Sequence, residues 1–149
     1  MNANRKAFLD MLSHSEGTDG FGYENGYNVI VGGALFNDYS KHPKIKVYFP
    51  KLKIYSTAAG RYQLLHRYWV AYCKQLGLHD FSPITQDLIA LQQIKECKAL
   101  DDIDAGRFDV AVHKCRRIWA SLPGAGYGQH ENKIDPLRIA YLEAGGKLS

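Results

Sequence analysis

The spacing of hydrophobic residues predicts a helix near the start of the chain. Phe8 and Leu12 recur at helical spacing within about Asn4 to Glu16, and Glu16 continues the same line of positions. Gly17 then follows as a helix stop signal. We therefore predict that Glu16 lies at the C-terminal end of an amphipathic helix, on its apolar side.

The helical spacing is lost from Gly17 to Gly60, where glycines, tyrosines and short β-prone runs take its place. The runs Val29–Val31 and Lys46–Phe49 are typical of short strands. The pattern predicts loops and a small antiparallel sheet, in a sheet-rich lobe at about residues 18–59.

Helical spacing returns in the remainder of the chain. Gly77 and Gly145 are stop signals, and Ser82-Pro83 is typical of a helix start. The predicted helices cover about residues 60–76, 82–99, 110–120 and 132–144. Because the chain has 149 residues and a hydrophobic content of 46%, we expect a single domain over residues 1–149. Its predicted class is α+β, a mostly helical body with a small antiparallel sheet.

Charge is distributed unevenly along the chain, although the formal net charge of +4 is mild. No acidic residue occurs between Asp38 and Asp80, an interval that contains eight lysines or arginines and six tyrosines. Two interpretations stay open for this stretch. It is either a solvated surface beside a core helix, or a groove for a polar polymer that also needs flat ring faces.

The cysteines and the hydropathy of the chain bear on compartment and cofactors. Cys73, Cys97 and Cys115 are odd in number and widely spaced, so we expect buried free thiols and synthesis in a reducing compartment. No spacing matches a metal site, and we expect neither a metal nor another cofactor. We find no signal peptide and no membrane-spanning stretch, which predicts a cytoplasmic location until another factor releases the protein.

Glu16 has the local features of a general acid. Burial on the apolar side of a helix and the dipole at the C-terminal end are both expected to raise its pKa. The charge of Asp19 acts in the same direction if it lies close. A carboxyl that stays protonated can donate to a leaving oxygen, which typically contributes ~10²–10⁴-fold in rate. The glycine-rich loop and the tyrosine-rich basic stretch follow directly, so we predict that Glu16 cleaves a polysaccharide.

A second carboxylate, which most glycosidases use, has no clear place in the sequence. The candidates are Asp19, Glu24 and Asp38, and Asp38 is also typical of an Asx-type turn. With one carboxyl, the C6 hydroxyl of the sugar can attack instead of water, and Glu16 then takes a proton from that hydroxyl. Three alternatives stay open: a hydrolytic lysozyme with a second carboxylate, a non-catalytic glycan-binding module, and a nucleic-acid binder that uses the basic stretch.

Five segments together resemble one known family. They are Ser15–Thr18, Gly26–Gly33, Gly60–Leu65, Asp80–Pro83 and Ile118–Gly128. In this order, and over nearly the whole chain, they closely resemble the lambda-type endolysins of phages and prophages. The resemblance implies a lysozyme-like fold whose sheet lobe flanks a substrate cleft. It also implies a peptidoglycan lytic transglycosylase, which cleaves the β-1,4 bond between N-acetylmuramic acid and N-acetylglucosamine and leaves a 1,6-anhydro end.

The resemblance extends to residues and partners. The catalytic glutamate of the family matches Glu16, and the loops after Asp19 and at Lys51–Ala59 differ in length from the family pattern. The expected substrate contacts are Tyr62, Gln63, Tyr127, Tyr39, Asp38 and Ser56. The expected partner is the glycan strand of peptidoglycan, whose lactyl and peptide carboxylates the lysines from Lys41 to Lys53 could attract. We further expect a monomer that accumulates in the host cytoplasm, leaves through holin lesions, and binds neither nucleic acid nor membrane stably.

Overall fold

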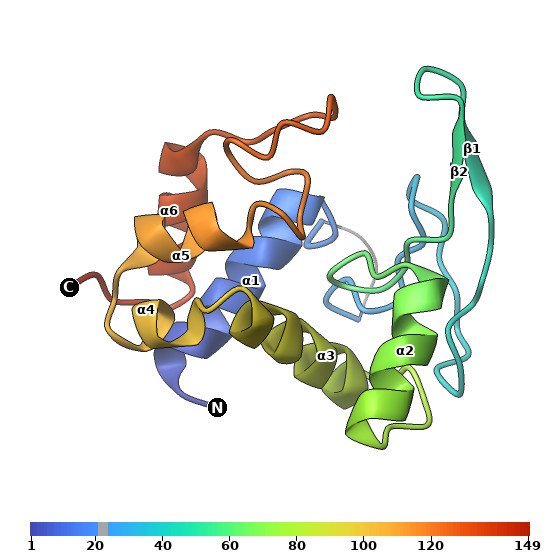
Figure 1. Ribbon diagram of the computed structural model, residues 1–149, viewed down its shortest axis with the longest axis horizontal. Coiled ribbons are helices and arrows are strands. Elements are labelled where there is room, and N and C mark those ends of the chain that lie inside the picture. Colours follow the sequence, from blue (N-terminus) through green and yellow to red (C-terminus); the bar gives the residue numbers. More distant parts are fainter. Residues whose placement is uncertain (21–23) are drawn as a thin grey trace. The chain divides into compact units, whose positions relative to one another are not determined.

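The computed structural model describes residues 1–20 and 24–149 and has an α+β architecture (Figure 1). Its elements in chain order are α1 (Ala3–Glu16), β1 (Val47–Phe49), β2 (Ile54–Ser56), α2 (His66–Leu76), α3 (Pro83–Glu96), α4 (Leu100–Asp104), α5 (Phe108–Cys115) and α6 (Ile134–Glu143). The chain divides into two compact units. Unit 1 contains Met1–Glu16 and Ala90–Ser149, and unit 2 contains Gly17–Ile89, so the division falls within α3.

Helix α1 supplies a buried hydrophobic stripe to unit 1, in agreement with the predicted amphipathic pattern. The helix packs against α4 and α6. Gly17 follows the helix with φ of 76°, a left-handed conformation that glycine adopts without a steric penalty. The buried hydrophobic residues of α1 are Ala7, Phe8, Leu9, Met11 and Leu12.

The later helices of unit 1 complete the same core. The ring centroid of Phe108, at the start of α5, lies 6.0 Å from that of Phe8 and 4.6 Å from that of Tyr141 in α6. Trp119 is 2% exposed, as expected for a core residue. The sequence pattern does not predict α4 as a separate helix, because its five residues are too few to show a helical period.

The sheet of unit 2 is a two-stranded antiparallel hairpin, which confirms the predicted small antiparallel sheet. The register pairs Val47 with Ser56, Tyr48 with Tyr55, and Phe49 with Ile54. The run Val29–Val31, predicted as a strand, forms only isolated bridges through Val29 and Ile30. That prediction is wrong because the chain turns back at once: the amide of Gly33 donates to the carbonyl of Ile30 at 2.9 Å.

The segment before α2 is irregular, so the helix predicted from residue 60 begins only at His66. Ala59 and Leu64 exchange both backbone hydrogen bonds, at 2.9 and 3.1 Å, and close a tight loop between them. Within this loop Gly60 has φ of 83° and Gln63 has φ of 54°. A Cβ atom on Gly60 would lie 2.4 Å from the side-chain oxygen of Gln86, so the loop requires glycine at that position.

A hydrophobic cluster forms the core of unit 2. Its buried members are Ala59, Leu64, Phe81 and Ile89, and the partly buried Phe36, Trp69, Tyr72, Leu76 and Leu78 pack against them. His42 is 2% exposed beside this cluster. Its Nδ1 accepts from the amide of Lys44 at 3.0 Å, so its Nε2 donates to the carbonyl of Leu64 at 2.8 Å. Burial lowers the pKa of His42 to about 4, so the ring is neutral and packs as an aromatic group.

Helix α3 begins as its sequence predicts, with Ser82 as the N-terminal cap. The hydroxyl of Ser82 accepts a hydrogen bond from the amide of Thr85 at 3.3 Å, which satisfies one of the unpaired amides of the first turn. All three cysteines are free thiols, as predicted. Cys97 and Cys115 are buried, but Cys73 is only partly buried, so the prediction of burial is wrong for that residue. Among the described residues, no helix has both the length and the apolar character needed to cross a membrane.

Candidate active site

Glu16 is the last residue of α1, at the position that the hydrophobic pattern predicts. The residue as a whole is half-buried, but its carboxyl group is enclosed by protein. Burial raises the pKa of Glu16 to about 7, and a hydrogen bond with the Ser121 side chain opposes this rise. The predicted direction of the shift is therefore confirmed, with burial as its main cause. Such a carboxyl is present in both protonation states at neutral pH, so it can donate a proton and accept one.

A polar network in unit 1 holds Ser121 beside the end of α1. The hydroxyls of Ser15 and Ser121 lie 2.7 Å apart. The side-chain amide of Asn132 donates to the carbonyl of Ser15 at 2.9 Å, and its backbone amide donates to the carbonyl of Ser121 at 2.7 Å. These bonds tie α1 to two later segments of the chain and fix the hydroxyl that contacts Glu16.

Tyr127 lies in the glycine-rich segment of unit 1. The carboxylate of Glu131 accepts hydrogen bonds from the amides of Gly124 and Gly126, both at 2.9 Å, and so organises this segment. Tyr127 is 54% exposed, while its hydroxyl donates to the backbone carbonyl of Arg117 at 2.9 Å. The ring is thus accessible but held in one orientation, which suits a contact with a sugar.

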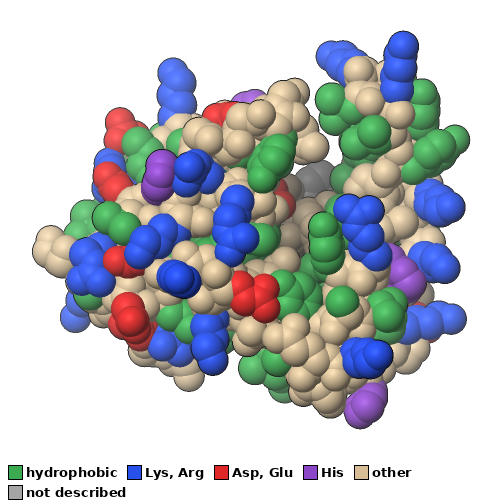
Figure 2. Space-filling model, viewed as in Figure 1, with side chains coloured by type: hydrophobic (Ala, Val, Ile, Leu, Met, Phe, Trp, Pro, Cys, Tyr) green, Lys and Arg blue, Asp and Glu red, His purple; other side chains and the backbone are tan. Residues whose placement is uncertain are grey.

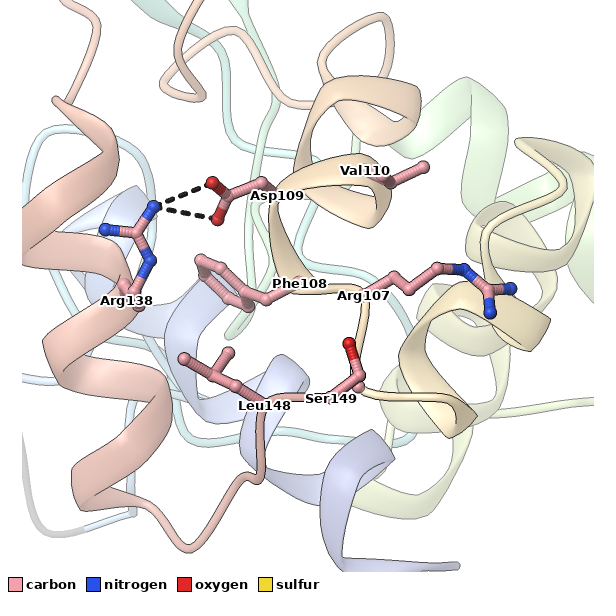
Figure 3. A pocket seen from close by; sticks show the side chains of 8 residues that line it. Arg107, Phe108, Asp109, Val110, Arg138, Leu148 and Ser149 are labelled. Carbon is pink, nitrogen blue, oxygen red and sulfur yellow. Dashed lines mark hydrogen bonds and ion pairs between the residues drawn. The ribbon is translucent and has the colours of Figure 1, made fainter.

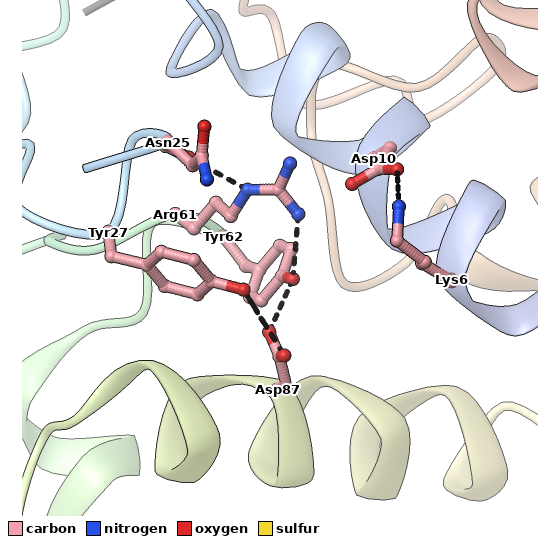
Figure 4. A network of polar contacts seen from close by, with 7 residues as sticks. All are labelled: Lys6, Asp10, Asn25, Tyr27, Arg61, Tyr62 and Asp87. Carbon is pink, nitrogen blue, oxygen red and sulfur yellow. Dashed lines mark hydrogen bonds and ion pairs between the residues drawn. The ribbon is translucent and has the colours of Figure 1, made fainter. Parts of the chain in front are cut away.

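Tyr62 belongs to a polar cluster of unit 2 that is centred on Asp87 (Figure 4). The carboxylate of Asp87 accepts from the hydroxyl of Tyr62 at 2.6 Å and from that of Tyr27 at 2.9 Å. The guanidinium of Arg61 lies 5.3 and 5.7 Å from the two ring centroids, and its Nε donates to the backbone carbonyl of Asn25 at 2.8 Å. Tyr62 is only 5% exposed, and its hydroxyl is bonded to Asp87 within this cluster.

Gln63 is fixed by backbone groups of unit 2. Its side-chain nitrogen donates to the carbonyl of Gly60 at 2.8 Å and to that of Val29 at 3.3 Å. A second glutamine, Gln86, is buried and braces the same loop, because its side-chain oxygen accepts from the amide of Arg61 at 2.8 Å. The loop that precedes α2 is therefore held rigidly by two side-chain amides.

Asp38 and Tyr39 lie in a turn of unit 2. Asp38 is exposed, and its carboxylate accepts from the amide of Ser40 at 2.9 Å, which is the Asx-type turn that the sequence offers as one interpretation. Hydrogen bonds from Ser40 lower the pKa of Asp38, so its carboxylate is ionised at neutral pH. The hydroxyl of Tyr39 donates to the carboxylate of Glu24. Of the three acids considered as a second carboxylate, Asp38 and Glu24 thus each have a hydrogen-bond partner nearby.

The predicted residues are shared between the two units. Glu16 and Tyr127 belong to unit 1, whereas the other predicted contacts belong to unit 2. Ser56, the last residue of β2, is half-buried, and its hydroxyl accepts from the amide of Ala58 at 3.1 Å. Within unit 2, the Asp87 cluster joins Tyr62 to the loop that contains Gln63.

A hollow of about 300 Å³ occurs elsewhere in unit 1, between α5, α6 and the last two residues (Figure 3). It is lined by Gly106–Val110, Arg138, Leu148 and Ser149, and Arg138 donates to both carboxylate oxygens of Asp109 at 2.7 and 2.9 Å. No predicted site residue lines this hollow. Within residues 1–20 and 24–149, no group of three or more His, Cys, Asp or Glu residues could hold a metal ion.

The sequence pattern does not single out Ser121, Asn132 or Asp87. Ser121 lies inside the segment Ile118–Gly128 that carries the family resemblance, which is the one signal that could have found it. Asp87 lies 60 residues from Tyr27, and Asn132 lies 117 residues from Ser15. These contacts depend on the fold, and local periodicity does not encode them.

The whole chain matches solved lysozyme structures. The structure of bacteriophage lambda lysozyme complexed with a chitohexasaccharide matches with a TM-score of 0.96 and 58% identity, over 100% of this chain and 98% of that chain. A second structure, lysozyme from bacteriophage lambda, matches with a TM-score of 0.92 and 56% identity over the same shares. The fold is therefore that of a lysozyme-like α+β protein, as predicted from the sequence.

Sequence comparisons define the family more closely. The family model described as Endolysin matches residues 6–148. The endolysin of Escherichia phage lambda is 61% identical over 152 residues, which cover 99% of this chain and 95% of that protein. The endolysin of Escherichia phage P2 is 50% identical over 155 residues, which cover 96% and 93%. The chain belongs to the Endolysin family. It is a lysozyme-like phage endolysin, an enzyme that cleaves the peptidoglycan of the bacterial cell wall.

Proposed function

We propose that this endolysin is a lytic transglycosylase. It cleaves the β-1,4 bond between N-acetylmuramic acid and N-acetylglucosamine, and Glu16 acts first as the acid and then as the base. The observation that carries the proposal is the state of Glu16, an enclosed carboxyl with a pKa of about 7 and a hydroxyl partner in Ser121. Such a carboxyl can donate a proton to the glycosidic oxygen as its bond to C1 breaks, and the resulting carboxylate can then accept a proton from a hydroxyl.

In the first step the protonated Glu16 donates its proton to the glycosidic oxygen. The bond between C1 of N-acetylmuramic acid and that oxygen breaks, and N-acetylglucosamine leaves with a free 4-hydroxyl. Positive charge develops on C1 and its ring oxygen, as in other glycosidases. The carboxylate that remains on Glu16 is the base for the next step.

In the second step the C6 hydroxyl of the same N-acetylmuramic acid attacks C1. The Glu16 carboxylate takes the proton of that hydroxyl, and the new bond between O6 and C1 closes the 1,6-anhydro ring. No water is consumed, and Glu16 returns to its protonated state. One carboxyl is therefore sufficient for the whole reaction, so a second acid is not required.

The substrate contacts of the proposal follow from exposure. The accessible ring of Tyr127 and the exposed turn at Asp38 can contact the glycan directly. The buried Tyr62 and the backbone-bonded Gln63 order the loop before α2. Tyr39 lies in the turn after Asp38, and Ser56 ends β2. In the proposed setting the protein is a monomer in the host cytoplasm that reaches the wall through holin lesions, without nucleic-acid binding or membrane insertion.

A hydrolytic lysozyme is the second candidate, because the ionised carboxylate of Asp38 has the protonation state of a base that activates water. Mass spectrometry of digested peptidoglycan separates the two reactions. Transglycosylation yields anhydro muropeptides that are lighter by one water than the reducing products of hydrolysis. Reducing ends alone would show that the transglycosylase assignment is wrong.

The Glu16→Gln variant tests the residue itself, and Asp38→Asn is the matched carboxyl-to-amide control. We expect Glu16→Gln to lose wall cleavage and Asp38→Asn to retain anhydro products. Unchanged cleavage by Glu16→Gln would exclude the proposed role of Glu16. Retained binding to peptidoglycan without any cleavage by the wild type would favour the non-catalytic glycan-binding module.

A further inference from the structure

The β1–β2 hairpin of unit 2 exposes almost all of its side chains. Every residue from Lys51 to Tyr55 is exposed, as are Lys44, Ile45, Lys46 and Tyr48 on the first strand side. The sheet has two strands, and a four-residue turn from Pro50 to Lys53 joins them. The hairpin thus has accessible edges and an accessible face. Packing against the core does not require so much exposed surface, so the hairpin is a candidate interaction surface.

Tyr48 and Tyr55 form an exposed aromatic pair across the two strands. They are directly opposite in register, and their ring centroids lie 4.9 Å apart with an interplanar angle of 50°. Tyr48 is 48% exposed and Tyr55 is 67% exposed. The pair holds two rings in a defined orientation while much of their surface stays accessible. Rigid rings of this kind contribute contact area at low conformational cost when a ligand binds.

Lysines flank this aromatic pair along the chain. Lys46 precedes Tyr48 by two residues, and Lys53 precedes Tyr55 by two residues. Neither lysine forms an ion pair with any residue of the described parts of the chain, 1–20 and 24–149. Figure 2 shows Lys or Arg side chains at the tip of the hairpin, next to hydrophobic side chains on the ribbon. We call Lys46, Tyr48, Lys53 and Tyr55 the tyrosine–lysine ribbon.

We propose that the tyrosine–lysine ribbon binds the carboxylate-bearing peptide stems of peptidoglycan. The inference rests on the proposed function, because it names the part of the same polymer that the hairpin recognises. The two ammonium groups bind stem carboxylates, and the ring pair packs against the apolar parts of the stem and its sugar. A glycan without peptide stems lacks the carboxylates that the two ammonium groups bind.

Charge complementarity favours peptide stems over a neutral chitin-like glycan. The acid-free interval from residue 39 to residue 79 contains the entire hairpin, so no internal carboxylate in that stretch competes with an external one. Stem carboxylates repeat along the polymer, so several weak contacts with exposed ammonium groups add together. Because both lysines are exposed, the contribution is screened by salt over about 8 Å at physiological ionic strength.

Co-sedimentation with insoluble cell wall tests the inference, and it is carried out in the Glu16→Gln background so that cleavage does not consume the polymer. The two ligands are intact peptidoglycan sacculi and chitin, an insoluble β-1,4-linked glycan that has neither peptide stems nor carboxylates. The test variant is Lys46→Gln/Lys53→Gln. The matched control is Lys74→Gln/Lys95→Gln, which removes the same charge from exposed positions on α2 and α3.

The test variant is expected to bind intact sacculi about three- to tenfold more weakly than the control at low salt, the size expected for two exposed ion pairs. The difference is expected to disappear at high salt and on chitin. An equal loss on both ligands, or a loss no larger than that of the control, overturns the inference. Lysine-dependent binding to phosphatidylglycerol vesicles, without a difference on intact sacculi, also overturns it and assigns the ribbon to an anionic membrane.

The outcome is independent of the proposed chemistry, because binding in this background requires no turnover. If anhydro products were absent from wild-type digests while stem-dependent binding persisted, only the transglycosylase assignment would fail. If anhydro products formed while both charge variants bound equally, only the role of the ribbon would fail.

Discussion

Two carboxyls of unit 1 are both withdrawn from solvent, yet their electrostatic surroundings are opposite. Glu16, at the end of α1, is hydrogen-bonded to the neutral hydroxyl of Ser121, and burial raises its pKa to about 7. Asp102, in α4, accepts hydrogen bonds from Lys114 at 2.6 Å and from Arg107 at 2.8 Å. These two cations lower the pKa of Asp102 below its usual range, although its side chain is only 8% exposed.

The comparison shows that burial alone does not decide what a carboxyl does. A buried carboxyl with cationic partners stays ionised and ties together the elements that supply those cations. A buried carboxyl with a neutral partner can donate a proton to a bound ligand or accept one from it. In this fold the first arrangement joins α4, α5 and the residue before α5, and the second is available for chemistry.

The largest expected difference between the two carboxyls is in the rate of wall cleavage after each is exchanged for its amide. We expect Glu16→Gln to lower the cleavage rate by at least ~10²–10⁴-fold, because both proton transfers use this group. We expect Asp102→Asn to retain most of the rate per folded molecule. Turbidity loss of cell-wall suspensions measures both variants, with circular dichroism as the control for folding. A rate loss in Asp102→Asn similar to that in Glu16→Gln would show that the two carboxyls are not functionally distinct.

The second expected difference is in stability, where loss of the Asp102 carboxylate has a larger effect than loss of the Glu16 carboxyl. We expect Asp102→Ala to lower the free energy of unfolding by about 1–3 kcal/mol, because it leaves two cations without their shared partner. This loss is smaller than is usual for a broken buried ion pair, because Arg107 and Lys114 are 49% and 38% exposed and water can solvate them. Urea denaturation measures the change. Glu16→Gln at pH 8 is expected to be as stable as the wild type or more stable, and a loss comparable to that of Asp102→Ala would contradict this account.

The two carboxyls also predict opposite pH dependences of stability. Between about pH 4.5 and 7, folded Glu16 keeps a proton that the unfolded chain has released, so stability falls as the pH rises through this window. Asp102 has a lowered pKa, so its stabilisation is present above the ordinary carboxyl pKa of about 4 and is lost at lower pH. Glu16→Gln is expected to remove the first slope, on the order of 1–2 kcal/mol, and Asp102→Asn the second. Thermal unfolding at several pH values measures both, and an unchanged slope in either variant would refute that half of the prediction.

The parts of the fold that depend on local sequence could be predicted. The amphipathic line of Phe8 and Leu12 predicts α1 and the position of Glu16, and Ser82 predicts the start of α3. The boundaries of α2 could not be predicted, because the loop before it is fixed by the contact of Gly60 with Gln86. Local periodicity carries no information about a partner 26 positions away in the chain.

The candidate site shows the same division. The apolar side of α1 predicts that the pKa of Glu16 is raised, because its main cause is local burial. The partner hydroxyl of Ser121 could not be predicted from periodicity, because 105 positions separate the two residues along the chain. Tyr62 was expected at the substrate, and the structure places its hydroxyl on Asp87, a contact that only the tertiary fold creates.

The smallest expected effect concerns the position of the pH profile. The hydrogen bond from Ser121 lowers the pKa of Glu16, so Ser121→Ala is expected to raise that pKa further, by about 0.5–1 unit. Because the first step needs a protonated Glu16, the alkaline limb of the cleavage profile moves to higher pH by the same amount. Ser121→Thr keeps the hydroxyl and is expected to restore the wild-type limb. A Ser121→Ala limb at the wild-type pH, or one displaced to lower pH, would mean that the hydroxyl does not set the proton affinity of Glu16. Its bonds with Ser15 and Asn132 would then have a purely structural role.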